Sequence, residues 1–208
     1  DNHMTISQSI NGALRRVPAW PVYLLGPLPA FWFLYLGLTG GLGPEPINAL
    51  ERELGEFGLK LLIVVLAITP LRKFTGISLI KYRRALGLVV FFYISAHLAV
   101  WLFLDVQIWN QIWKDIVKRP YITIGMAGLL AMVPLAITSN NWSIRKMGPQ
   151  SWKRLHWLTY SVGVLGAVHF IMIQKVWEAE PLLYLAVILA LLATRLGVRK
   201  LWAAATAG

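Results

Sequence analysis

The chain has 208 residues, of which 57% are hydrophobic and only 14% are charged. Soluble domains carry about a quarter charged residues, and a soluble fold of this size could not bury so much apolar surface, so a soluble binding module is excluded. The formal charge of +11 lies in short clusters between long apolar runs, which is typical of membrane-protein loops and not of a nucleic-acid-binding surface. The absence of cysteine excludes disulfides, thiolate metal sites and thiolate-linked haem.

The chain opens on Asp1-Asn2-His3-Met4, which is typical of a cloning scar, so His3 is left out of the functional candidates. A membrane-spanning helix needs about 17–25 mostly apolar residues, and six later segments come close to this length. The expected spans are 19–39, 55–70, 82–104, 121–138, 152–174 and 181–197.

These segments predict an all-α integral membrane protein with a six-helix transmembrane bundle. Residues 19–197 form this domain, between a cytoplasmic N-terminal segment at 1–18 and a cytoplasmic tail at 198–208. Pro27 and Pro29 in the first span, and Pro134 in the fourth, predict kinks. The second span is short, and the stem of Lys60 within it can reach toward an interface.

Charge predicts the orientation of the bundle. Fourteen of the 20 basic residues fall in the segments on the same side as both termini, and five fall on the other side. Cytoplasmic loops of membrane proteins carry the excess of Lys and Arg. Both termini are therefore expected in the cytoplasm.

One outer loop, residues 105–120, has a helical pattern of its own. Ile108, Ile112 and Ile116 recur every four residues beside Trp109 and Trp113, which predicts one apolar helical face. Such a helix either lies on the outer membrane surface or forms a docking surface for an outside partner.

Three histidines, His97, His156 and His169, lie within predicted spans. An ionisable residue in a span is costly and is by default a functional-site candidate; the alternative is a neutral histidine hydrogen-bonded between helices. At about 1.5 Å per residue, His97 lies roughly 22 Å and His169 roughly 25 Å from the cytoplasmic ends of their spans. Two imidazoles at matching depth on parallel helices can bind one haem iron from opposite faces, which suits electron transfer.

His156 is placed differently from the other two histidines. It lies only about 6 Å from the cytoplasmic end of its span, and about 140° around an ideal helix from His169. No histidine of the third span matches its depth. It therefore either belongs to a second haem with an unusual second ligand or serves another cofactor.

Basic and small residues near the histidines suggest a cofactor with acidic groups. Arg83 and Arg84 begin the third span, and Arg154 lies just before His156. Guanidinium groups bind carboxylates and phosphates bidentately, so these arginines can hold haem propionates or a flavin phosphate. The alternative is that they only mark the cytoplasmic side of the membrane. Three glycines leave room for a flat ring or merely allow close helix packing. They are Gly87, Gly163 and Gly166.

An ordered set of short motifs resembles a known family. The motifs are GLGPEP at 41–46, LAITPL at 66–71, YRRALGL at 82–88, AHL at 96–98, KRPYITIG at 118–125 and WKRLHWLTY at 152–160, followed by His169. Over roughly residues 41–197 the chain resembles the MsrQ or YedZ type of haem-binding membrane subunit from periplasmic methionine sulfoxide reductase systems. This type lies within the ferric-reductase-like transmembrane family.

The resemblance implies a protein of the bacterial inner membrane with haem b, either one or two, held at the positions of His97, His156 and His169. The matched depth favours His97 and His169 as the axial pair. It also implies a bound flavin mononucleotide (FMN). Electrons would come from a cytoplasmic flavin reductase or a membrane quinone. They would pass to a periplasmic molybdopterin-containing methionine sulfoxide reductase that repairs oxidised proteins.

Two other functional classes stay open. A stand-alone transmembrane ferric or quinone reductase would perform the reduction itself at an outer site. A histidine-based metal or proton transporter would use the histidines as ligands or relays. Transporters of that kind carry carboxylates near the middle of their spans, and the predicted spans carry none at that depth.

Overall fold

The computed structural model of the chain describes residues 6–174, 176 and 178–195. The cloning scar with His3, the tail at 198–208 and the end of the sixth predicted span lie outside the described residues. Within the described part, every regular element is a helix, so the all-α prediction is confirmed there.

The elements follow one another along the chain with short connections. They are α1 (Ile6–Arg16), α2 (Trp20–Leu25), α3 (Leu28–Leu38), α4 (Pro46–Thr75), η1 (Ile80–Tyr82), α5 (Arg83–Val100), η2 (Trp101–Val106), α6 (Trp109–Lys118), α7 (Pro120–Ile137), α8 (Asn141–Met147), α9 (Pro149–Leu155), α10 (Leu158–Ile173) and α11 (Ala179–Ala193). The element η1 is a 3₁₀-helix and η2 is a π-helix.

Five stretches of the described chain are long and apolar enough to cross a membrane. They are Trp20–Leu38, Pro46–Thr75, Ile80–Val106, Pro120–Ile137 and Pro149–Ile173. A sixth apolar helix, α11, has 15 residues and coincides with most of the last predicted span. The chain is thus an all-helical multi-pass membrane protein, and the count of six spans stays a prediction.

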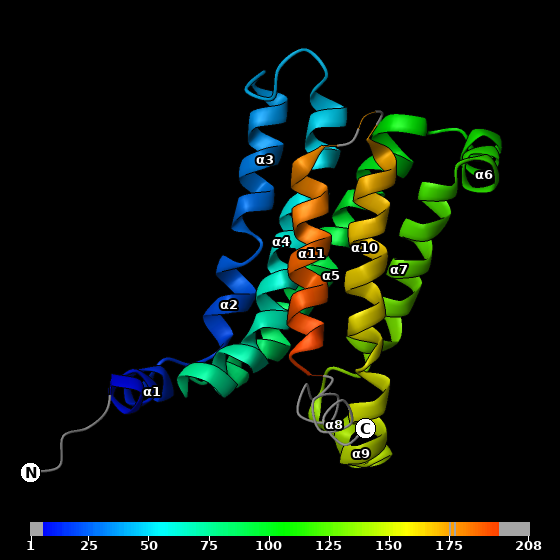
Figure 1. Cartoon of the computed structure of the whole chain (residues 1–208). Helices are drawn as coiled ribbons and strands as arrows, with labels where there is room; N and C mark the ends of the chain where they lie inside the picture. The colour runs from blue at the N-terminus through cyan, green and yellow to red at the C-terminus, as the bar shows by residue number, and fades with distance from the viewer. Residues whose placement is uncertain (1–5, 175, 177, 196–208) are drawn as a thin grey trace, which may run out of the picture.

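The long helices run side by side and define two ends of the bundle (Figure 1). We call one of them the α8 end, because α8 lies there with α1, α9 and the end of α11. The opposite end, the α6 end, carries α6 and the connection between α3 and α4. In between, α4 packs against α5, and α10 packs against α7 and α11. Tyr93, Leu66 and Ile188 are fully buried in this packing.

The first span is broken at Gly26 and Pro27, near the predicted kink. Pro27 has no backbone N–H to continue the helix. The hydroxyl of Tyr93 in α5 fills the gap, because it donates to the Gly26 carbonyl at 2.8 Å and accepts from the Ala30 N–H at 3.1 Å. A Cβ at Gly26 would lie 2.8 Å from the side chain of Val89, so only glycine allows α5 to approach this closely.

The predicted bounds of the second span were wrong, because α4 is a 30-residue helix. It begins with Pro46 at its first turn, a position that needs no backbone donor, and ends at Gly76, whose φ of 77° is left-handed. The helix continues through Pro70. Lys60 was expected to reach toward an interface, and its ammonium group donates to the carboxylate of Glu56 one turn earlier.

The fifth predicted span is not one continuous helix. The helix α9 ends at Leu155, and α10 begins at Leu158. The turn between them has i→i+3 bonds from the Trp157 N–H to the Arg154 carbonyl and from the Thr159 N–H to the His156 carbonyl. The ideal-helix angle between His156 and His169 therefore does not apply.

The loop between the third and fourth spans does contain a helix, α6, but its predicted apolar face divides in two. Ile112 is buried against the bundle, and Trp109 and Trp113 are 81% and 68% exposed on the outside. Asp115 is also buried, because it accepts from Gln111 at 3.1 Å and pairs with Arg119 at 3.3 Å. Ile108 is 64% exposed as well, so the predicted apolar face is divided between the bundle and the outside. Residue spacing alone does not show which of these side chains the bundle covers.

Candidate functional site

A cavity of about 390 Å³ opens in the α6 half of the bundle, between α4, α5, α7 and α10. Its volume lies within the range of small-molecule sites, about 300–1,000 Å³. Aliphatic and aromatic side chains line its deeper part, including Leu62, Met132 and Phe170. Charged and amide side chains line it as well. They are Asn48, Glu51, Arg52, Glu56, Asp105, Arg119 and Gln174.

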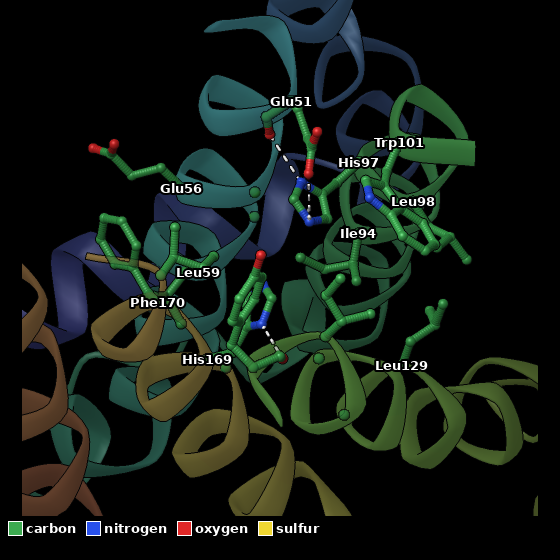
Figure 2. Close-up of a pocket in the computed structure, with 18 of the residues that line it drawn as sticks. Glu51, Glu56, Leu59, Ile94, His97, Leu98, Trp101, Leu129, His169 and Phe170 are labelled. Carbon is green, nitrogen blue, oxygen red and sulfur yellow. Dashed lines mark hydrogen bonds and ion pairs between the residues drawn. The ribbon is translucent and has the colours of Figure 1, made fainter. Parts of the chain in front are cut away.

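Two of the three candidate histidines, His97 and His169, meet in this cavity (Figure 2). His97 comes from α5 and His169 from α10, and their ring centres are 6.1 Å apart with the ring planes at 84°. This short distance is consistent with the prediction that the two histidines lie at the same depth in the membrane.

Backbone carbonyls fix the orientation of both imidazoles. Nδ1 of His97 lies 2.8 Å from the carbonyl oxygen of Glu51, and Nδ1 of His169 lies 2.7 Å from that of Tyr121. A carbonyl oxygen only accepts, so Nδ1 is the protonated nitrogen of each neutral ring, and Nε2 keeps its lone pair. This is the tautomer that metal-binding histidines adopt when a second group holds the other nitrogen.

Glycines provide the space that the two rings occupy. A Cβ on Gly55 of α4 would lie 3.0 Å from Nδ1 of His97. A Cβ on Gly125 of α7 would lie 2.8 Å from both Cε1 and Nδ1 of His169. Each imidazole is therefore packed directly against a helix backbone. A side chain at either glycine would force the ring or the helix to move.

The glycines predicted to make room for a flat ring have different surroundings. Of the three, only Gly166 lines the cavity. Gly163 packs against Leu66 and Ile188, and a Cβ on Gly87 would meet no atom within 4 Å.

His156 lies apart from the other two histidines, at the α8 end. Its ring stacks on Trp152 with centres 3.8 Å apart, and its Nε2 is 3.2 Å from the Thr138 hydroxyl. It does not line the cavity.

The predicted arginines are also at the α8 end, where Arg83 and Arg84 lie close enough to His156 for electrostatic interaction. Arg84 donates to the side-chain oxygen of Asn141 at 2.8 Å. Arg154 is exposed, whereas Arg83 is half-buried. Arg83 faces Tyr160 and Arg195, and Arg195 is a residue that the sequence did not single out.

The donor set and its spacing fit a haem iron. Metal–imidazole bonds are about 2.0 Å long, so two imidazoles on opposite sides of one metal have ring centres about 6 Å apart, as His97 and His169 do. In the part of the chain that is described, no group of three or more His, Cys, Asp or Glu side chains is placed to hold a metal ion. Two imidazoles leave a metal short of ligands, and a flat macrocycle supplies the remaining four.

Sequence reasoning missed Glu51, Gly55 and Gly125 in this site. One signal could have found the glycines, since Gly55 and Gly58 in α4 have the same three-residue spacing as Gly125 and Gly128 in α7. Residues three apart share a helix face, and all four glycines line the cavity. Glu51 contacts His97 twice, because its backbone carbonyl holds Nδ1 and its carboxylate lies 4.0 Å from Nε2. No side-chain pattern in the sequence indicates the backbone contact.

Comparison with known proteins identifies relatives of this chain. The family model described as ferric reductase like transmembrane component matches residues 54–167. A protein of Brucella anthropi is 48% identical over 178 residues, which cover 85% of this chain and 80% of the relative, and one of Brucella ovis is 49% identical with the same coverage. Both are named protein-methionine-sulfoxide reductase heme-binding subunit MsrQ. No solved structure matches the chain.

The match covers more than half of the chain and includes His97 and His156. The chain belongs to the ferric-reductase-like transmembrane family, among the MsrQ-type proteins. The resemblance inferred from the sequence motifs is therefore confirmed.

Proposed function

We propose that this chain is a haem b electron-transfer subunit of a methionine sulfoxide reductase system in the bacterial inner membrane. The observation that carries the proposal is the pairing of His97 and His169 across one cavity, with ring centres 6.1 Å apart and both Nδ1 atoms bonded to backbone carbonyls. The names of the relatives support the type of system.

Each part of the site has a defined task in this proposal. His97 and His169 would hold the haem iron through their Nε2 nitrogens, and the carbonyls of Glu51 and Tyr121 hold the rings in the ligating tautomer. When bound, haem b supplies the one-electron chemistry of its iron. The aliphatic and aromatic side chains in the cavity limit the access of water, and the charged side chains beside them also influence the potential at which an electron is accepted.

The α8 end is proposed to receive electrons. Its candidate groups are His156, for a second haem or another cofactor, and Arg83, Arg84 and Arg154, for haem propionates or the phosphate of FMN. The proposed donor is a cytoplasmic flavin reductase or a membrane quinone, and the proposed acceptor is a periplasmic molybdopterin-containing methionine sulfoxide reductase that repairs oxidised proteins.

This direction requires the α8 end to be cytoplasmic, with α11 as the sixth span and residues 19–197 as the membrane domain. Charge supports this orientation, because twelve described Lys and Arg residues belong to segments at the α8 end and four to segments at the α6 end. Residues 1–18 and 198–208 are then cytoplasmic.

The optical spectrum of detergent-purified protein, with pyridine haemochrome quantitation, tests the proposal. We expect a low-spin haem b spectrum. About one haem per chain would assign the cofactor to His97 and His169 alone, and about two would bring in His156. Absence of a Soret band from protein produced with ample haem would contradict the proposal.

A second measurement separates this function from a stand-alone ferric or quinone reductase. The purified chain, reduced chemically and mixed with a water-soluble quinone or ferric chelate, is followed by the re-oxidation of its haem. We expect re-oxidation to be much faster with the sulfoxide reductase partner than with either small acceptor. Rapid turnover with quinone or ferric chelate alone would favour the stand-alone enzyme.

A further inference from the structure

Among the described residues, the segments at the α8 end carry basic side chains and no carboxylate. All eight described acidic residues belong to segments at the α6 end. They are Glu45, Glu51, Glu53, Glu56, Asp105, Asp115, Glu178 and Glu180. Two arginines at the α8 end, Arg83 and Arg195, are half-buried. Neither has a carboxylate nearby among the described residues, so another group is needed to balance their charge.

Arg195 lies just after α11 and connects it to two other helices. Its Nη2 donates to the carbonyl of Leu66 in α4. That carbonyl lacks its usual partner four residues later, because Pro70 has no N–H. Its Nη1 donates to the hydroxyl of Tyr160 in α10 at 2.8 Å, and the guanidinium carbon lies 4.7 Å from the centre of the Tyr160 ring. The remaining nitrogen, Nε, is enclosed and has no hydrogen-bond partner.

Arg83 approaches the same hydroxyl from α5. It lies close enough to Tyr160 and to Arg195 for electrostatic interaction with both, and it is half-buried. Two guanidinium groups from different helices therefore share one neutral oxygen.

This arrangement is unfavourable without an anion. Buried charges in proteins are normally paired, because removing a charge from water is costly. Here two like charges are brought together, and their described neighbours are a hydroxyl, a carbonyl and the imidazole of His156, and none of these is an anion. A phosphate group carries a charge of about −1.5 to −2 at neutral pH, which balances two arginines, and its oxygens match the guanidinium fork.

We propose that Arg83, Arg195 and Tyr160 form an oxyanion site between α5, α10 and α11 that binds a phosphate group. The site deepens the role given to Arg83 in the proposed function and names Arg195 as its partner, since Arg84 is bonded to Asn141 and Arg154 is exposed. The phosphate belongs either to a nucleotide-like cofactor or to a lipid headgroup, and these two sources share the same recognition chemistry.

Binding of radiolabelled inorganic phosphate to the detergent-purified full chain tests the site. Equilibrium dialysis should give saturable binding of one phosphate per chain. Arg195→Gln and Arg83→Gln should each weaken the affinity at least tenfold, because each removes a charge-assisted contact to the phosphate. Arg145→Gln is the matched control, since Arg145 is exposed on α8 at the same end, and its affinity should equal that of the wild-type chain.

The Soret band of each variant reports whether the haem cavity is still formed, so failure of this site and failure of the haem proposal are distinguishable. If Arg195→Gln does not fold, Arg195→Lys keeps the charge but lacks the planar fork, and it should still bind phosphate more weakly than the wild-type chain. Unchanged affinity in the folded Arg195 variant, an equal loss in Arg145→Gln, or no saturable phosphate binding by the wild-type chain would each overturn the proposal.

Competition identifies the source of the phosphate. FMN should displace labelled phosphate where riboflavin, which lacks the phosphate, does not, if the site serves a flavin nucleotide. Bicelles containing phosphatidylglycerol should displace it where pure phosphatidylcholine bicelles do not, if the site serves an anionic lipid. Either result supports an oxyanion site, whereas displacement by riboflavin as effective as that by FMN would contradict it.

Discussion

Gly125 has no side chain, so the backbone of α7 lies directly against the imidazole of His169. A Cβ there would lie 2.8 Å from two ring atoms, closer than side-chain atoms normally approach. His169 is also held by the Tyr121 carbonyl one helical turn before Gly125. The ring therefore has little freedom to move aside, and the glycine is a determinant of its position.

Gly125→Ala should consequently disturb the haem site. Overpacking of this kind costs about 1–3 kcal/mol, and we expect lower haem occupancy with a weakened low-spin spectrum in the purified variant. Gly87→Ala in α5 is the control, because its added Cβ meets no atom within 4 Å. An unchanged spectrum and haem-to-protein ratio in Gly125→Ala would show that the ring is free to shift.

His169→Ala should abolish the low-spin bis-histidine spectrum, because it removes one of the two axial nitrogens from the cavity. His156→Ala should leave that signal intact, because His156 stacks on Trp152 at the other end of the bundle. Electron paramagnetic resonance of the oxidised variants measures both outcomes. Survival of the signal in His169→Ala would rule out the proposed ligand pair.

The pairing of His97 and His169 could be predicted from the sequence, because depth along two parallel helices depends only on residue count. The role of the glycines could not, since it depends on which helix faces each ring. Arg195 was missed for a related reason. In the sequence it is only one of the basic residues that predict the orientation. Its contacts with Leu66 and Tyr160, which are 129 and 35 positions away in the chain, are visible only in the folded structure.

Among the elements, the break between α2 and α3 depends most on one side chain. Tyr93 is fully buried, and its hydroxyl joins the Gly26 carbonyl and the Ala30 N–H across the interruption. In an apolar environment an unpartnered carbonyl is costly, so this tyrosine stabilises an otherwise incomplete helix.

Tyr93→Phe should lower the free energy of unfolding by about 1–3 kcal/mol, the usual cost of leaving a buried polar group without its partner. Reversible unfolding in mixed detergent, followed by circular dichroism, measures the change. Tyr23→Phe in α2 is the control, because Tyr23 is 43% exposed. Equal stability of Tyr93→Phe and the wild-type chain would mean that another donor reaches Gly26.

The positions of the spans could be predicted from hydropathy, but their ends could not. The first turns of α4 contain Glu51, Arg52 and Glu53, so an apolar window excluded them although the helix continues through them. The helix also passes Pro70, where Arg195 donates to the freed carbonyl. The division between α9 and α10 at His156 has no proline or glycine to indicate it, and it depends on turn hydrogen bonds that only the folded chain forms.

The whole molecule offers a direct test of orientation because it contains no cysteine. Any introduced cysteine is therefore the only thiol. Lys114→Cys in α6 should react with a membrane-impermeant maleimide added to intact spheroplasts, and Lys146→Cys in α8 should react only after the membrane is opened. Both lysines are exposed. The reverse pattern would place the termini outside and exclude the proposed direction of electron transfer.

The sixth span is the part of the topology that rests on the shortest helix. At 15 residues, α11 is about 22 Å long, less than the roughly 30 Å of bilayer hydrocarbon. It nevertheless connects the two ends of the bundle, because Glu178 before it lies 3.9 Å from Arg52, and the Thr194 carbonyl after it accepts from Lys73 at 3.2 Å.

These contacts predict that α11 crosses the membrane fully. Thr194→Cys should then have the same labelling pattern as Lys146→Cys, and Glu178→Cys the same pattern as Lys114→Cys. A re-entrant helix would instead place both new cysteines on one side. That outcome would leave five spans and put the two termini on opposite faces, and Arg195 could then no longer reach Tyr160 from the cytoplasmic side.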